Sequence, residues 1–170
     1  NGSPQRNQFS RFDFEYPNFL NRKYDTLQGY GQSKTAVNLF SLELDHLAKT
    51  HRIRAYSLHP GSIAGTELGR EASMELFQKM GFLDADGNML PEVAASLKTI
   101  PQGAATTVWC ASSPLLNNVG GVYCEDAEVA LLAPGNSIQN GVKPYSLDEI
   151  SAKRLWTWSE EMTGIAFNIN

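Results

Sequence analysis

Tyr30 and Lys34 are the two residues whose types and spacing most directly suggest chemistry. In an α-helix, residues four apart lie on the same face, one turn from each other. A free phenol has a pKa of about 10, but a nearby ammonium favours its ionised form. Such a pair can donate a proton to a carbonyl oxygen or take one from an alcohol. For the bare pair an ordinary exposed helix face is favoured, because this spacing is common by chance.

A helix and a following strand are expected to hold this pair in place. A long helix is expected over 26–50, where apolar residues recur at the three-to-four spacing of one helical face. A short strand is expected over 53–58, and His59-Pro60-Gly61 ends it, because Pro cannot continue a central ladder. A helix followed closely by a strand is half of a parallel-sheet crossover. The sequence therefore predicts an α/β fold.

The rest of the chain supplies further elements without an internal repeat or domain boundary, so residues 1–170 are expected to form a single domain. Ser146 and Glu149 have the spacing of a capping box, which predicts the start of the last helix. The remaining expectations are an irregular segment over 1–25, two short helices around a turn at 84–88 within 67–100, a helix over 101–112, a strand over 121–124 and a last helix over 146–164.

Composition excludes several classes of function. Hydrophobic residues make up 42% of the chain, charged residues 19%, and the formal net charge is −4. No basic tract occurs, so a nucleic-acid partner is not expected. No apolar run is long enough to predict a transmembrane helix, and membrane association is not indicated in this segment. Cys110 and Cys124 cannot form a disulfide scaffold and suit a reducing compartment, which favours a cytoplasmic location.

Competing sites have simpler structural interpretations. His46 and His51 are five residues apart and point in different directions, and no carboxylate–histidine spacing resembles a zinc motif, so no metal site is expected. Cys110 and Cys124 lie in apolar surroundings, where free cysteine is usually buried. Gly120-Gly121 precedes a strand instead of a helix, which favours close backbone packing over phosphate binding.

Several linked motifs favour a catalytic role for Tyr30 and Lys34 over an ordinary helix face. They are, in chain order, Gly29-Tyr-Gly-Gln-Ser-Lys-Thr-Ala36, Leu58-His-Pro-Gly61, Thr66-Glu-Leu-Gly-Arg70, Gln102-Gly-Ala-Ala-Thr106 and Gly120-Gly-Val-Tyr123. From about Phe9 to Gly164, this succession resembles the second half of a short-chain dehydrogenase/reductase, most closely the retinol-dehydrogenase and WW-domain-oxidoreductase group. The resemblance implies the C-terminal part of a Rossmann-type, doubly wound parallel sheet in three α/β/α layers.

The resemblance also implies roles for individual residues. Tyr30 matches the catalytic acid/base, and Lys34 matches the lysine that stabilises its phenolate and hydrogen-bonds the nicotinamide ribose. Pro60 and Gly61 match the turn beside the nicotinamide. The run from Gly61 is one residue longer than the common spacing of the family. The positions that hold the carboxamide and the phosphates fall on Ile63 and Thr66, and the variable substrate lid falls on residues 67–100.

The chain departs from the family pattern at its start. The Gly-rich dinucleotide-binding turn and the Asn-Ala-Gly motif are missing, and the chain begins Asn1-Gly2-Ser3 without Met. We therefore expect a fragment that lacks the N-terminal dinucleotide-binding half. For the catalytic serine the candidates are Ser3 and a serine upstream of Asn1; an ordinary loop or cap role for Ser3 is the favoured interpretation. The choice between NAD and NADP stays open.

The leading hypothesis is an NAD(P)-dependent oxidoreductase that interconverts an alcohol and a ketone or aldehyde by hydride transfer, with Tyr30 as general acid/base assisted by Lys34. The isolated chain is expected to be inactive, and its small-molecule substrate is not identified. The alternative is a non-catalytic fragment or pseudoenzyme that acts as an interaction or dimerisation module, because an unpaired sheet edge favours association. In this alternative the fragment dimerises with, or inhibits, a full-length relative through its long helix. A homodimer is also among the expected partners.

Overall fold

The longest helix, α1 (Thr26–Ala48), has a start encoded in its own sequence. We determined the arrangement from a computed structural model that describes residues 10–63, 70, 72–133 and 141–168. The Asp25 side chain caps α1 by accepting a hydrogen bond from the Gln28 amide at 2.8 Å. A short 3₁₀ turn, η2 (Lys49–His51), ends the helix, and Arg52 adopts a left-handed conformation with φ of 60° that reverses the chain.

The strands form a small mixed sheet in the order β1-β2-β3. Strand β1 (Tyr56–His59) pairs in parallel with β2 (Val122–Glu125), which confirms the expected α/β class. The sheet departs from the expected parallel arrangement at one strand, because β3 (Glu128–Val129) pairs antiparallel with β2. A tight turn with positive φ at Asp126 and Ala127 makes this hairpin possible.

Strand β1 begins later than the predicted 53–58 and ends at His59. The Ala55 amide, which could bond to a neighbouring strand, donates instead to the Asp45 carboxylate on α1 at 3.0 Å. The Ala55 carbonyl already accepts from Gly121, at 2.8 Å, so sheet pairing starts at this point on one side only. The hydrogen bond to Asp45 of the helix therefore replaces a backbone hydrogen bond within the sheet, and the regular strand starts at Tyr56.

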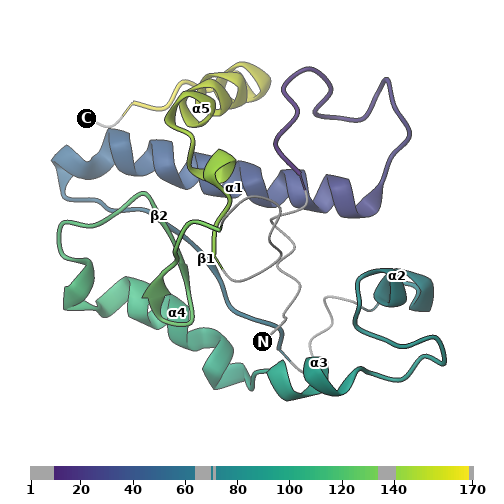
Figure 1. The fold of residues 1–170 in the computed structure, drawn as a ribbon. Helices are drawn as coiled ribbons and strands as arrows, with labels where there is room; N and C mark the ends of the chain where they lie inside the picture. Colours follow the sequence, from purple (N-terminus) through teal and green to yellow (C-terminus); the bar gives the residue numbers. More distant parts are fainter. Residues whose placement is uncertain (1–9, 64–69, 71, 134–140, 169–170) are drawn as a thin grey trace.

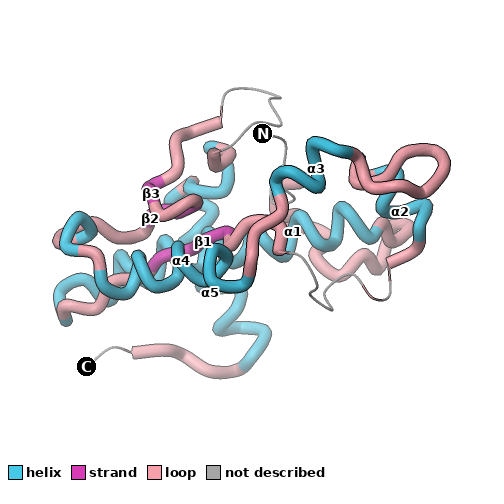
Figure 2. Tube along the Cα trace, turned by 90° about the horizontal axis from the view of Figure 1, so that it is seen from below, coloured by secondary structure: helices cyan, strands magenta, loops and turns pink. Residues whose placement is uncertain are grey.

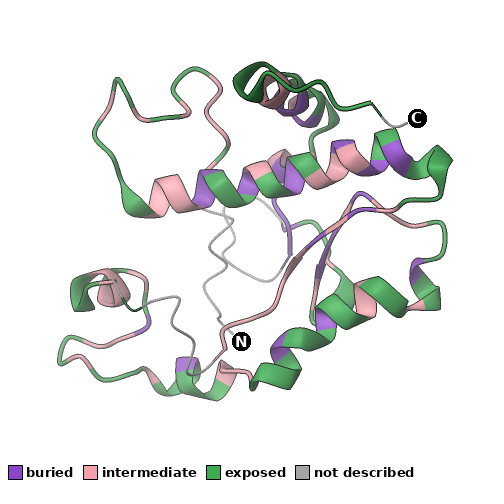
Figure 3. Cartoon of the chain, turned by 180° about the vertical axis from the view of Figure 1, so that it is seen from behind, coloured by how far each residue is buried: buried purple, intermediate pink, exposed green. Residues whose placement is uncertain are grey.

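Helices cover both sides of the strands. Helix α1 lies on one side and α4 (Ile100–Ser112) on the other, with α5 (Glu149–Thr163) packed against α1 (Figure 1). Buried residues lie in the strands and along α1, whereas most of α4 is exposed (Figure 3). The main apolar cluster sits between α1 and α5, where Leu39, Ala152 and Leu155 are buried and Phe12, Phe14 and Trp158 pack around them.

The caps of the last two helices differ from expectation. The predicted capping box at Ser146 and Glu149 is wrong: the Asp148 side chain caps α5 by accepting from the Ser151 amide at 2.8 Å. Ser146 is buried in a 3₁₀ turn, η5 (Pro144–Leu147), and Gly164 ends α5 in a left-handed conformation with φ of 70°. A capping box does occur at Thr99 and Gln102, where it starts α4.

The segment that corresponds to the expected lid contains α2 (Met74–Lys79) and α3 (Pro91–Ser96). Between them Asp84 accepts hydrogen bonds from the Asp86 and Asn88 amides, which stabilise a turn. This segment lies beyond the strands, at the end where α1 begins (Figures 1 and 2). Lys79 Nζ is 3.9 Å from the Asp25 carboxylate at the start of α1.

Across the described ranges, no helix combines the length and apolar character needed to cross a membrane.

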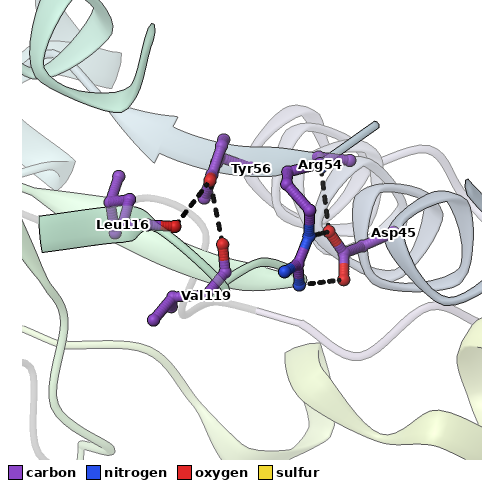
Figure 4. A network of polar contacts seen from close by, with 6 residues as sticks. Asp45, Arg54, Tyr56, Leu116 and Val119 are labelled. Atoms are coloured by element: carbon purple, nitrogen blue, oxygen red, sulfur yellow. Dashed lines mark hydrogen bonds and ion pairs between the residues drawn. The ribbon is translucent and has the colours of Figure 1, made fainter. Parts of the chain in front are cut away.

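Asp45 joins the end of α1 to the chain that enters β1 (Figure 4). Its carboxylate accepts two hydrogen bonds from the Arg54 guanidinium, at 2.8 Å each, and one from the Ala55 amide. At Gly120 a Cβ would lie 2.6 Å from Arg54 Nε, so a side chain there would displace the Asp45–Arg54 pair. This confirms the close packing expected for Gly120-Gly121.

The electrostatics of Asp45 favour its charged form. Burial by itself would raise the pKa of this carboxyl, but the Arg54 guanidinium and the Ala55 amide outweigh it and hold the pKa below its ordinary value of 3.8. Because the folded-state pKa is lower than the unfolded-state pKa, Asp45 stabilises the fold above the unfolded value. This stabilisation disappears as the pH falls through the folded-state value.

We predict that Asp45→Asn lowers the free energy of unfolding of the native protein by about 1–2 kcal/mol at pH 7. The difference from wild type should shrink below the ordinary carboxyl pKa of 3.8, because wild type then loses the same charge. Urea denaturation at several pH values measures it. Glu161→Gln, which removes an exposed carboxylate on α5, is the control and should change little. Equal stability of Asp45→Asn and wild type at pH 7 would contradict the prediction.

Candidate active site

Tyr30 and Lys34 are adjacent on the N-terminal half of α1, as their spacing predicts. Lys34 Nζ lies 5.1 Å from the centroid of the Tyr30 ring, so the ammonium faces the aromatic side chain. Tyr30 is half-buried and Lys34 is exposed. A phenol that is partly open to solvent and next to a cation can exchange a proton with a small molecule.

The chain before α1 is fastened to the same half of the helix. The Thr35 hydroxyl donates to the Ser10 carbonyl at 2.9 Å, and the Ser10 hydroxyl donates to the Gln28 carbonyl at 2.9 Å. The Asp13 amide donates to the Gln32 side-chain oxygen at 2.8 Å. Thr35 and Gln32 are buried, so these bonds fix the helix segment that carries the tyrosine and the lysine.

A second group of candidate residues follows β1. Pro60, Gly61 and Ile63 are half-buried, and the Gly61 amide donates to His59 Nδ1 at 3.1 Å. Gly61 has φ of +84°, which L-residues rarely adopt, so the sharp turn expected after His59 requires glycine here. Ile63 forms a parallel bridge with Lys98.

Chain geometry brings the two groups to the same end of the molecule. The path back along α1 from Ala48 to Tyr30 is about 27 Å at the rise of an α-helix. The path forward from Ile53 to Gly61 is about 26 Å if extended. Because the chain reverses at Arg52, the tyrosine and the turn after β1 reach a similar level. Two predicted site residues, Ser3 and Thr66, lie outside the described residues.

Sequence reasoning missed the residues that surround the turn after β1. His59 and Glu125 are partners in the strand register at the carboxyl ends of β1 and β2. Burial raises the pKa of Glu125, although the Gly141 amide and Lys98 act against this shift. Lys98 forms an ion pair with Asp126. The position of His59 and Glu125 at strand ends is a signal that could have been used, whereas Lys98 belongs to no recognisable motif.

The two cysteines and the histidines do not form an alternative reactive site among the described residues. Burial, together with the Cys110 side chain, raises the pKa of the Cys124 thiol to about 12, and burial also raises that of Cys110. Both thiols are therefore poor nucleophiles near neutrality. Among the residues whose placement is described, no cluster of three or more His, Cys, Asp or Glu side chains could hold a metal ion.

A cavity of about 550 Å³ lies between α4 and the start of β1, and none of the described candidate residues lines it. Lys49, Arg52 and Arg54 contribute to its wall, together with Tyr56 at the first position of the strand. Pro60 and Gly61 follow the other end of the same strand. This basic cavity therefore lies at the N-terminal end of β1, whereas the turn with Pro60 and Gly61 follows its C-terminal end.

Curated proteins similar to the chain are oxidoreductases by name. "Probable oxidoreductase" from Streptomyces lividans is 41% identical over 151 residues, covering 88% of this chain and 50% of that protein. "Retinol dehydrogenase 13" from Mus musculus is 34% identical, covering 91% of this chain and 41% of its own length. "Short-chain dehydrogenase/reductase prx1" from Penicillium roqueforti is 32% identical, with coverages of 86% and 41%. No protein-family model matches the chain.

A solved structure supports the fold. The crystal structure of an uncharacterized protein from Mycobacterium Paratuberculosis superimposes with a TM-score of 0.52 at 22% identity. The superposition covers 98% of this chain and 50% of that one. The chain likewise spans about half the length of the curated relatives it matches. The chain thus belongs to the short-chain dehydrogenase/reductase superfamily, of which it represents a C-terminal part.

Proposed function

We propose that the protein containing this chain is a nicotinamide-dependent oxidoreductase that interconverts an alcohol and a ketone or aldehyde. The observation that carries the proposal is the Tyr30–Lys34 pair, with Nζ 5.1 Å from the ring centroid, on the helix that leads into β1. Membership of the superfamily and the oxidoreductase names of its relatives support the same reaction class. The reaction therefore needs a proton carrier, and Tyr30 suits that role.

In this mechanism Tyr30 holds or moves the proton at its Oη atom. In the direction of alcohol oxidation the phenolate takes the hydroxyl proton, and in the reverse direction the phenol gives a proton to the carbonyl oxygen. The Lys34 ammonium stabilises the phenolate and offers hydrogen-bond donors to a ribose hydroxyl. The hydrogen bonds from residues 10–13 to α1 hold the helix segment that carries both side chains in place.

The cofactor would be held by Lys34 and by the turn after β1. When bound, a nicotinamide dinucleotide supplies or accepts the hydride. In open α/β sheets, ligands bind outside the carboxyl ends of parallel strands, which is where Pro60, Gly61 and Ile63 lie. These residues fit the role because their half-buried backbone forms a tight glycine turn and Ile63 adds an apolar surface. Thr66 and Ser3 complete the proposed set.

We also propose a more specific assignment of the sheet. The parallel pairing of β1 and β2, covered by helices on both sides, supports the C-terminal part of a Rossmann-type doubly wound sheet. We propose residues 67–100 as the substrate lid, because α2 and α3 lie beyond the strands at the end where α1 begins. The contact of Lys79 with Asp25 supports this placement.

We predict that Tyr30→Phe lowers kcat of the native protein by about 10²-fold or more, because it removes the proton carrier and leaves the ring. Binding of NADH or NADPH, measured by their fluorescence, should change by less than about threefold. Tyr16→Phe removes an exposed phenol outside α1 and is the matched control. If Tyr30→Phe kept full turnover, a non-catalytic interaction module would become the better explanation.

Lys34→Met should lower kcat and raise the KM for the nicotinamide cofactor, each by about tenfold or more, because Lys34 both stabilises the phenolate and binds the ribose. Lys34→Arg keeps the charge and should recover part of kcat but less of the cofactor KM. Steady-state kinetics with the cofactor varied separate the two effects. An unchanged cofactor KM in Lys34→Met would refute the ribose contact.

A further inference from the structure

Lys98 touches the turn after β1 through both its backbone and its side chain. Its amide donates to the Ser62 carbonyl at 2.7 Å, and its backbone bridges Ile63 in parallel. A Cβ placed on Gly61 would lie 2.6 Å from Lys98 Cδ and 3.0 Å from Nζ. The aliphatic stem therefore lies directly against the Gly61 backbone and occupies the space that a side chain would need there.

The end of the Lys98 side chain reaches a third element, the β2–β3 turn. Its ammonium forms an ion pair with the Asp126 carboxylate. Asp126 has positive φ, and the next amide, that of Ala127, donates to the hydroxyl of Thr106 at 3.1 Å. Thr106 is only 1% exposed on α4, so the turn that carries Asp126 is anchored to a fixed helix.

The same loop is held from the side of α4. A Cβ on Gly103 would overlap the Ile63 side chain, and its third-nearest neighbour would be the Pro60 carbonyl oxygen, at 3.7 Å. The helix thus meets the loop without an intervening side chain. The loop over 60–63 therefore lies between α4 on one side and the aliphatic stem of Lys98 on the other. The ammonium at the end of that stem is held by Asp126.

We propose that the Lys98–Asp126 ion pair is a clasp that positions the backbone of Gly61–Ile63 and so sets the affinity for the nicotinamide cofactor. Lys98 is a positioning residue here, not a catalytic one. The proposal rests on the proposed function, since it concerns the loop assigned to the nicotinamide. The side chain of Lys98 is 24% exposed and that of Asp126 is 59% exposed, so the pair adds little to global stability. Variants that open it should therefore fold.

A double-mutant cycle on the native protein tests the clasp. Lys98→Met keeps the stem against Gly61 and removes the charge, Asp126→Asn removes the partner charge, and the double variant removes both. We expect each single variant to raise the Kd for NADH or NADPH by about fivefold to tenfold. The double variant should bind the cofactor no more weakly than either single variant does. kcat at saturating cofactor should fall by less than about threefold. Lys153→Met, on the exposed face of α5, is the control.

Hydrogen exchange without cofactor gives a readout that does not depend on activity. The amides of Lys98 and Ala127 should exchange about tenfold faster in Lys98→Met and in Asp126→Asn, and at the wild-type rate in Lys153→Met. Unchanged exchange in the two clasp variants would overturn the proposal. So would a loss of affinity in Lys98→Met alone, because Lys98 would then contact the cofactor directly.

The two proposals can fail separately. If wild type bound neither NADH nor NADPH, the proposed function would fail and the effect of the clasp on cofactor affinity would be overturned with it. Exchange at the Lys98 and Ala127 amides would still confirm or refute that the ion pair holds the loop. If wild type bound the cofactor and Lys98→Met bound it equally well, only the clasp would be overturned.

Discussion

The arrangement of this chain depends on the Asp45 carboxylate, which is 5% exposed and connects the last turns of α1 to the chain entering β1. Two hydrogen bonds from Arg54 and one from Ala55 satisfy it. The Tyr56 hydroxyl adds a bond to the Val119 carbonyl at 2.8 Å, which links β1 to the approach to β2 (Figure 4). A buried charge whose partners are all satisfied therefore holds the C-terminal end of α1 against the start of β1, and Tyr56 extends this connection toward β2.

The candidate site lies at the other end of these elements. Since α1 and β1 leave the Asp45 end in similar directions and over similar lengths, Tyr30 and Gly61 reach the same level without a direct link between them. Hydrogen bonds of the buried residues Thr35 and Gln32 hold the Tyr30 side. The Gly61 side is held by a partly exposed ion pair and by close contact with α4. The two halves of the site thus differ in how firmly they are fixed.

Local sequence signals predicted most of the regular elements. The apolar spacing of α1, the Pro-Gly turn after β1 and the glycine at the end of α5 each act over a few residues, so they can be seen without a fold. The predictions went wrong where two local signals compete. Ser146 offered a plausible cap, but Asp148 lies nearer to the first helical residue and binds the Ser151 amide. Strand β3 has only two residues and no turn signature, which left it unpredicted.

Local patterns along the chain were enough to predict the superfamily, the Tyr30–Lys34 pair and the glycine turn after β1, because each depends on residues close together in the chain. The fold brings residues from distant parts of the chain to that turn. Lys98 and Asp126 are separated by 28 positions, and neither belongs to a motif, so only the parallel bridge to Ile63 and the hairpin after β2 bring their charges together. Contacts of this kind depend on how the chain returns to the same edge of a sheet, which spacing along a sequence does not encode.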